Sequence, residues 1–254
     1  MTQTIDRKTP PRIKDAIEFD LKLKPYEKAT LANGADVYAV NAGAEDVLVV
    51  EWVFKAGNWF EKKNLVAATA NFMLKNGTST KNAFQLNEHF EYYGSHLNRT
   101  CSNETATITL HCLSKHLEVL LPVVRELITD SIFPEEELAT YKQNMQQRLR
   151  VNLKKCDFVA GRLIDTYLYG EEHPYGRFTR FEDFEALTRE EIVAFYKEYY
   201  LAGKFTVFAA GKLPSTIFTL LDQHFGDLPM QASTAIDISP QPMAEKKYRV
   251  INDP

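Results

Sequence analysis

The sequence predicts an α+β fold with a mixed, largely antiparallel sheet. The turn dipeptide Asn33-Gly34 separates two short strand-like runs, which indicates a β-hairpin. Residues 105–113 alternate between apolar and polar side chains, as a strand with one buried face does. From residue 64 onward, several stretches repeat apolar residues at helical spacing. Strands and helices therefore both contribute to the fold.

The composition is that of an ordinary globular protein. The chain has 254 residues, of which 44% are hydrophobic and 25% charged, so it can bury a substantial core in one large domain or two small ones. Its net charge is −4, its pI is about 5.9, and it has no basic stripe, so nucleic acid is not an expected partner. No apolar run approaches the roughly 18 residues of a membrane-spanning helix, so no membrane span is expected.

The N-terminus and the cysteines bear on location. Residues 1–17 are polar, contain Pro10-Pro11 and lack the apolar segment of a signal peptide, so we expect a flexible arm there. Cys101, Cys112 and Cys156 show no C-x-x-C spacing, which favours reduced thiols that fill small spaces in the core. These features favour a cytoplasmic protein. A periplasmic location stays open if the natural sequence begins further upstream.

The first elements expected are strands. Two strands, at 26–32 and 36–40, flank Asn33-Gly34, which predicts a type I′ turn because both central positions of that turn need positive φ. Residues 47–54 (VLVVEWVF) are nearly all apolar and rich in β-branched side chains. That pattern is typical of a strand buried on both faces.

The central stretch is 64–78, NLVAATANFMLKNGT, which predicts a largely buried helix that ends at Gly77. A second helix is expected at about 81–93, where Gly94 ends it. The segments 95–101 and 105–113 then predict a pair of strands.

The rest of the sequence is mainly helical. Pro122 lies inside a helix that follows Ser114 and should kink or break it. Phe133-Pro134 opens a long helix with three glutamates in its first turn, where acid suits the helix dipole. Thr188 and Glu191 show the capping-box pattern. Helices are expected at 115–130, 135–154, 158–168, 189–200 and 215–225, a strand at 205–210, and a linker with the first strand of a further domain at 230–254.

Several phrases occur in an order that resembles one protein family. They are FKAGNWFE, NGTSTKNAFQLNEHFEYYGSHLN, FPEEELATYKQ, GEEHPYGR and LTREEIVAFYKEYY, followed by the last strand and helix. Over about 26–229 the ordered set resembles the N-terminal half of the insulinase/pitrilysin family of zinc metallopeptidases, which includes the mitochondrial processing peptidase subunits. The resemblance implies a sheet backed by helices in a domain at 18–229, and a homologous second half that begins within 230–254.

Active members of that family carry H-x-x-E-H on the helix that corresponds to 64–78. Two imidazoles at i and i+4 share one helical face and bind one zinc ion, and the glutamate activates the bound water. By resemblance, the histidine positions are Ala68 and Phe72, and the base position is Asn71. A distant glutamate ligand falls within Gln147–Leu149, where Arg148 would repel a cation. These residues predict neither a zinc cofactor nor catalysis by the family's mechanism.

No other metal site is predicted. None of the six histidines shows the two-ligand helical spacing of a zinc site, so we expect them at the surface or at interfaces. A relocated zinc site that uses His89 or His96 is the alternative that this leaves open. The histidines are His89, His96, His111, His116, His173 and His224.

Peptide binding does not require the metal. The resemblance implies that substrate adds as a strand to a sheet edge at Asn98, Arg99 and Thr100, with Asn98 reaching the substrate main chain. It also implies pairing, because several family members combine a catalytic subunit with one that lacks the zinc motif. We therefore expect a non-catalytic subunit that binds polypeptide beside an active zinc peptidase. A stand-alone peptide-binding or scaffold protein, as a homodimer, and an enzyme with a relocated site are the alternatives.

Overall fold

The computed structural model describes residues 22–231, so the predicted arm at 1–17 and nearly all of the segment 230–254 lie outside it. The strands are β1 (Glu27–Thr30), β2 (Asp36–Asn41), β3 (Val47–Phe54), β4 (His96–Cys101), β5 (Ala106–Leu113) and β6 (Phe205–Gly211). They form one sheet in the order β1-β2-β6-β3-β5-β4, in which only β2 and β6 pair in parallel. The predicted mixed, largely antiparallel sheet is confirmed.

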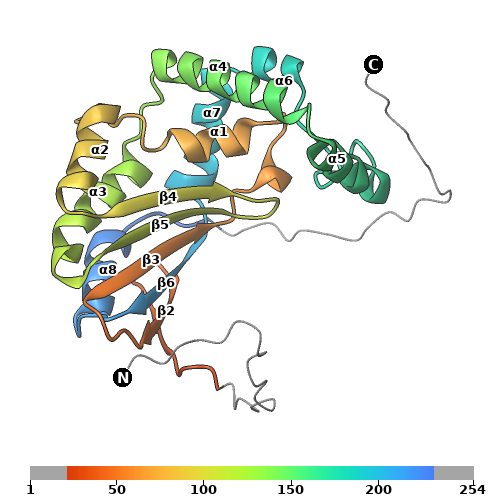
Figure 1. The fold of residues 1–254 in the computed structure, drawn as a ribbon. Coiled ribbons are helices and arrows are strands. Elements are labelled where there is room, and N and C mark those ends of the chain that lie inside the picture. Colours follow the sequence, from red (N-terminus) through yellow and green to blue (C-terminus); the bar gives the residue numbers. More distant parts are fainter. Residues whose placement is uncertain (1–21, 232–254) are drawn as a thin grey trace, which may run out of the picture.

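Helices gather on one side of the sheet and beyond its β4 edge (Figure 1). In residues 22–231 they are α1 (Val66–Met73), α2 (Ala83–Tyr92), α3 (Leu117–Thr129), α4 (Glu135–Asn152), α5 (Cys156–Tyr169), α6 (Phe181–Ala186), α7 (Arg189–Tyr196) and α8 (Ile217–Phe225). The short helix α6 has no counterpart among the predicted elements. Helix α3 continues through Pro122, so the helix does not break there. None of the described helices combines the length and the apolar character that crossing a membrane requires.

Strand β3 shows which face of the sheet is covered. Every second residue from Leu48 to Phe54 is buried, and the residues between them are only half-buried. On the buried face, the ring centroid of Trp52 lies 5.0 Å from that of Phe225 in α8. The prediction of two buried faces was wrong, because an apolar run does not reveal whether a second layer covers both sides. Glu51, in the middle of the strand, lies on the open face.

The hairpin between β1 and β2 is present, but its turn differs from the prediction. The carbonyl oxygen of Leu31 accepts a hydrogen bond from the Gly34 amide at 2.8 Å, and the Leu31 amide donates to the Ala35 carbonyl oxygen at 2.8 Å. Gly34 has a φ of 89°, whereas Asn33 is not among the residues with positive φ. This is a three-residue loop with a glycine bulge, not a type I′ turn. The Asn33 side-chain amide instead donates to the Phe225 carbonyl oxygen at 2.9 Å, which ties the turn to α8.

Helix α1 is shorter than the predicted 64–78. It begins after Leu65, which has a left-handed φ of 75°, and its last residue is Met73. Gly77, with a φ of 147°, lies beyond the helix and forms an isolated bridge with Asn82. The glycine therefore shapes the connection to α2 and does not cap α1 directly.

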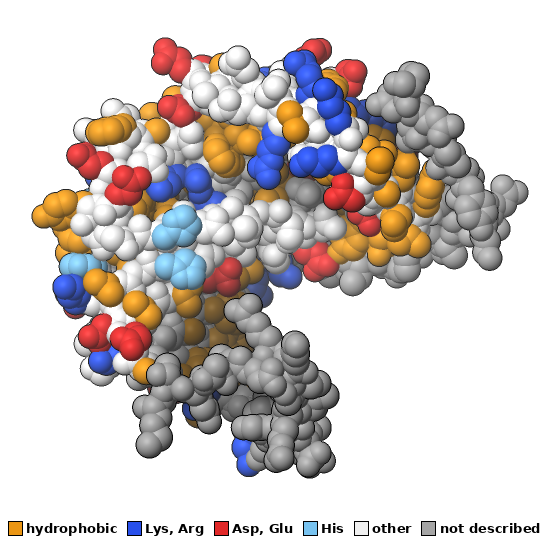
Figure 2. All heavy atoms as spheres, viewed as in Figure 1, with side chains coloured by type: hydrophobic (Ala, Val, Ile, Leu, Met, Phe, Trp, Pro, Cys, Tyr) orange, Lys and Arg blue, Asp and Glu red, His pale blue; other side chains and the backbone are white. Residues whose placement is uncertain are grey.

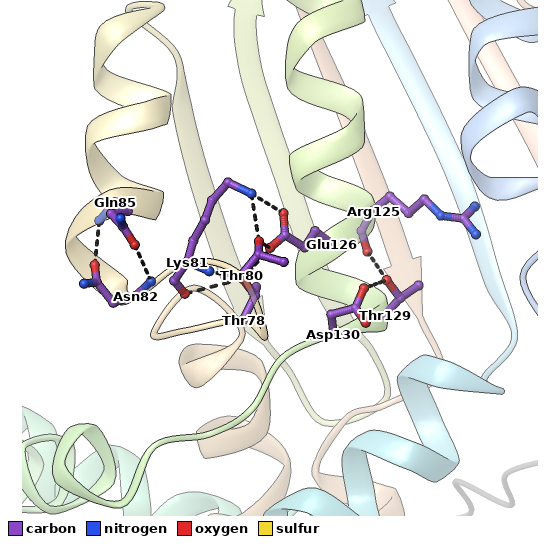
Figure 3. Close-up of polar contacts among 9 residues, drawn as sticks. All are labelled: Thr78, Thr80, Lys81, Asn82, Gln85, Arg125, Glu126, Thr129 and Asp130. Atoms are coloured by element: carbon purple, nitrogen blue, oxygen red, sulfur yellow. Dashed lines mark hydrogen bonds and ion pairs between the residues drawn. The ribbon is translucent and has the colours of Figure 1, made fainter.

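Glu126 of α3 fastens this connection to the rest of the fold (Figure 3). Its carboxylate accepts hydrogen bonds from the hydroxyls of Thr78 and Thr80, and its Oε2 lies 2.6 Å from Lys81 Nζ. Burial acts to raise the pKa of Glu126, but the three donors outweigh it and hold the pKa below its usual value. Asn82 then caps α2. The C-terminal end of α1 is thereby fixed relative to α3.

Candidate functional site

Helix α1 keeps one narrow face accessible. Six of its 8 residues are buried, and the two exceptions are Ala68 and Phe72, of which Phe72 is 38% exposed. They are four residues apart, so they lie on one side of the helix. They are also the two positions that the resemblance assigns to zinc-binding histidines. The face is oriented as a ligand site would be, but a methyl group and a phenyl ring offer no atom that can bind a metal.

Asn71, which the resemblance assigns to the position of the general base, is buried and takes part in packing. Its Nδ2 donates to the Thr107 carbonyl oxygen at 3.2 Å and to the Tyr200 hydroxyl at 3.1 Å. Tyr200 is buried in the π-helical turn Lys197–Leu201, and burial raises its pKa. A side-chain amide cannot take a proton from water at neutral pH. Asn71 therefore joins α1 to β5 and to the turn after α7.

Helix α4 supplies no ligand from the predicted third position. In Gln147–Leu149 the leucine is 7% exposed and the other two side chains face solvent. Earlier in α4, the ring centroid of Tyr141 lies 4.7 Å from that of Phe72. Burial raises the pKa of the Tyr141 hydroxyl. An aromatic pair therefore links α4 to α1 at the second histidine position.

Arg99 of β4 lies over the same ring. Its guanidinium carbon is 5.1 Å from the Phe72 ring centroid, and its Nη1 donates to the Phe72 carbonyl oxygen. Burial lowers the pKa of Arg99 to about 10. Asn98 and Thr100 are exposed and project from the opposite face of the strand. The three predicted peptide-binding residues therefore do not form one cluster, and only Arg99 reaches α1.

Strand β4 is the last strand of the sheet and packs beside α1. It pairs with β5 from His96 to Cys101, and its other edge pairs with no strand of residues 22–231. The unpaired N–H and C=O groups of such an edge can hydrogen-bond to an added extended strand. The edge next to the degenerate face of α1 is therefore suited to bind a strand.

The histidines are dispersed. The ring centroids of His96 and His111 lie 6.4 Å apart across β4 and β5, while His89 and His116 both pack against Tyr93. Among residues 22–231, no group of three or more His, Cys, Asp or Glu side chains is placed to hold a metal ion. The residues at the predicted ligand positions of α1 and α4 do not fit zinc either, because none of them offers an imidazole, a thiolate or a carboxylate.

Glu61 is a buried residue of the site region that the sequence did not single out. It is 6% exposed, and its Oε2 accepts a hydrogen bond from the Ala67 amide at 2.9 Å, at the N-terminus of α1. Burial raises its pKa to about 7, against the opposing effects of the Ala67 hydrogen bond and the Arg177 charge. In the sequence, the one indication of this role is an acidic residue shortly before the predicted helix. The spacing between Glu61 and the start of the helix is longer than the spacing in a capping box.

Two family models match the sequence. The model described as Insulinase (Peptidase family M16) matches residues 37–173, which is more than half of the chain and includes α1 and β4. The model described as Peptidase M16 inactive domain matches residues 186–254.

Curated relatives and solved structures agree with these matches. An "Uncharacterized zinc protease" of Rickettsia felis is 25% identical over 192 residues, which cover 74% of this chain and 46% of the relative. The "Probable mitochondrial-processing peptidase subunit beta, mitochondrial" of Arabidopsis thaliana is 25% identical over 244 residues, covering 88% of this chain and 44% of the relative. The chain therefore spans less than half the length of these relatives.

Among solved structures, the peptidase M16 inactive domain from Pseudomonas fluorescens matches with a TM-score of 0.79 at 24% identity, over 87% of this chain and 55% of that chain. A protease from Helicobacter pylori matches with a TM-score of 0.74 at 21% identity, over 87% and 54%. These two likenesses establish the fold. With the family model that covers more than half of the sequence, they lead to one conclusion: the chain belongs to the insulinase family, peptidase family M16.

Proposed function

We propose that this protein is a non-catalytic member of its family that binds extended polypeptide without cleaving it. One observation carries the proposal: the accessible face of α1 consists of Ala68 and Phe72, and the neighbouring Asn71 is engaged in packing. The family's hydrolysis needs a metal-bound water and a carboxylate base. The side chains at these three positions supply neither.

Polypeptide binding is supported by the free edge of β4. An added strand gains main-chain hydrogen bonds along that edge, and alternate side chains of the strand point toward opposite faces of the sheet. On one face they would meet Asn98 and Thr100, which are exposed, and on the other they would meet Arg99 and Phe72. The edge thus offers chemically different surroundings to successive side chains of a peptide.

We also propose that the protein acts beside an active zinc peptidase of the same family. Relatives include proteins named as the beta subunit and the alpha-1 subunit of mitochondrial-processing peptidase, which supports a pairing of unlike subunits. In such a pair, this subunit would help to enclose the substrate while the partner supplies zinc. A stand-alone peptide-binding or scaffold protein is the alternative.

The test combines metal analysis with peptidase assays. Zinc per protein molecule is measured by plasma mass spectrometry, and cleavage of a quenched fluorescent peptide library is measured for the protein alone and mixed with a zinc-containing relative from the same source. We expect no stoichiometric zinc and no cleavage alone, and faster cleavage on mixing than with heat-denatured protein. One zinc per molecule, with activity that is lost on substitution of His89 or His96, would overturn the proposal. A stable homodimer that leaves the relative's activity unchanged would favour the stand-alone role.

A further inference from the structure

Arg99 is a partly buried cation that has no counter-ion within residues 22–231. Among residues 22–231 its one hydrogen bond goes from Nη1 to the neutral carbonyl oxygen of Phe72, and no carboxylate forms an ion pair with it. Its Nε is buried and has no hydrogen-bond partner in that part of the protein. By contrast, Arg125 pairs with Asp227, and Arg180 pairs with Glu171 at 2.8 Å. A guanidinium has five N–H donors, so most of the binding capacity of Arg99 is unused.

A second cation reinforces the charge at this place. Lys75, just beyond the end of α1, has a pKa lowered first by burial and then by the charge of Arg99, although Glu91 acts in the opposite direction. Its Nζ lies 5.2 Å from the centroid of the Phe90 ring. Two partly buried cations that repel each other are costly unless an anion joins them.

The surroundings determine what kind of anion has access. Arg99 lies over the accessible Phe72 and on β4, whose outer edge pairs with no strand of the described part of the chain. Figure 2 shows Lys and Arg side chains gathered in the band between the β4–β5 strands and the helices above them. An extended peptide that adds to β4 would place every second side chain on the helical side of the sheet, toward Arg99. The anion best placed to reach the guanidinium is therefore carried by that added peptide.

We propose that the guanidinium of Arg99 binds a carboxylate of the polypeptide that adds to the edge of β4. This inference rests on the proposed function and names a specificity for it. A carboxylate matches the planar fork of a guanidinium and forms charge-assisted hydrogen bonds with it. The positive charge that zinc supplies in active relatives is replaced here by an arginine, which holds an anionic group and does not activate water.

The carboxylate has two sources, the C-terminus of the bound polypeptide or one of its Asp or Glu side chains, and the probes separate them. Four fluorescein-labelled peptides of one β-forming sequence are compared: with internal Asp or Asn, and with a free or an amidated C-terminus. Their dissociation constants are measured by fluorescence anisotropy for wild-type protein, Arg99→Gln, Arg99→Lys and the control Arg150→Gln. Arg150 is an exposed arginine of α4, so its substitution makes the same change in net charge.

We expect the wild type to bind one of the carboxylate peptides at least about tenfold more tightly than its neutral counterpart. Arg99→Gln should lose that preference while still binding the neutral peptide, Arg99→Lys should retain part of it, and Arg150→Gln should behave as wild type. Preference for the free C-terminus or for internal Asp identifies the source. If the ratio of the dissociation constants for neutral and carboxylate peptides is the same in the wild type and in both folded Arg99 variants, the inference is overturned. The proposal of peptide binding is unaffected by that result. Absence of binding to all four peptides would instead overturn the proposed function, and the inference with it.

Discussion

Replacement of Asn71 by alanine should destabilise the fold, although the resemblance assigns Asn71 to the position of a catalytic base. Asn71 is 2% exposed, and its Nδ2 bonds to Thr107 and Tyr200. Alanine removes both hydrogen bonds, each with a net contribution of about 1 kcal/mol, and leaves the buried Tyr200 hydroxyl without this partner at a cost of about 1–2 kcal/mol. We expect Asn71→Ala to lower the free energy of unfolding by about 3–4 kcal/mol.

Urea unfolding followed by circular dichroism measures this quantity for the wild type, Asn71→Ala, Tyr200→Phe and the double variant. Tyr200→Phe removes one of the same hydrogen bonds and also removes the hydroxyl that Asn71→Ala leaves unpaired, so the double variant should lose about 2–3 kcal/mol less than the sum of the single losses. Asn144→Ala, at a position of α4 outside the core, is the control and should stay within about 0.5 kcal/mol of the wild type. If the free energy of unfolding of Asn71→Ala also stayed within about 0.5 kcal/mol of the wild type, Asn71 would have no packing role. The interpretation of α1 would then be refuted.

Two further predictions concern the same helix. Burial raises the pKa of Glu61 from 4.5 to about 7, so the folded state binds this proton more tightly than the unfolded state does. The protonated Glu61 therefore contributes its full stabilisation below about pH 4.5. This contribution, up to about 3 kcal/mol, is lost as the pH rises to about 7. Glu61→Gln should remove this pH dependence in urea unfolding across that range, and an unchanged slope would contradict the assignment. Ala68→His with Phe72→His places two imidazoles on the accessible face of α1, and Arg99→Gln removes the guanidinium that opposes a cation there. This triple variant should gain micromolar zinc affinity by titration calorimetry, at least about tenfold tighter than Ala68→His with Arg99→Gln. No gain in a folded triple variant would show that these positions do not share a ligand face.

Much of this arrangement was predictable from the sequence. The alternation in 105–113 and the apolar run 47–54 located two central strands within a residue, because strand periodicity is a local property. The motif positions came from the family resemblance, and the structure places Ala68 and Phe72 one helical turn apart on the accessible face of α1. What local pattern could not give was the layer arrangement, so β3 was assigned two buried faces although Glu51 lies on an open one.

The partners of the site residues could not be predicted, because they come from distant parts of the sequence. Tyr200 bonds to Asn71 from 129 residues away, and Arg99 reaches Phe72 across 27 residues. The resemblance placed Asn98, Arg99 and Thr100 together at a sheet edge, but it did not show that strand alternation puts Arg99 on the helical side and its neighbours on the other. The register of β4 against β5, and not the motif itself, decides which residue faces α1.

The positions in α1 that the resemblance assigns to a metal ligand and to the base are engaged in contacts with the rest of the fold, which distinguishes the site from a zinc site that has merely lost a ligand. Phe72 packs against Tyr141, its carbonyl oxygen accepts a hydrogen bond from Arg99, and Asn71 bonds to Tyr200. These contacts involve Phe72 and Asn71, the positions that the resemblance assigns to a metal ligand and to the base. A guanidinium beside the second ligand position also opposes a divalent cation by direct repulsion, which is strong where solvent is excluded. The same charge attracts a carboxylate, so the features that disfavour zinc at α1 are those that favour an anionic peptide there.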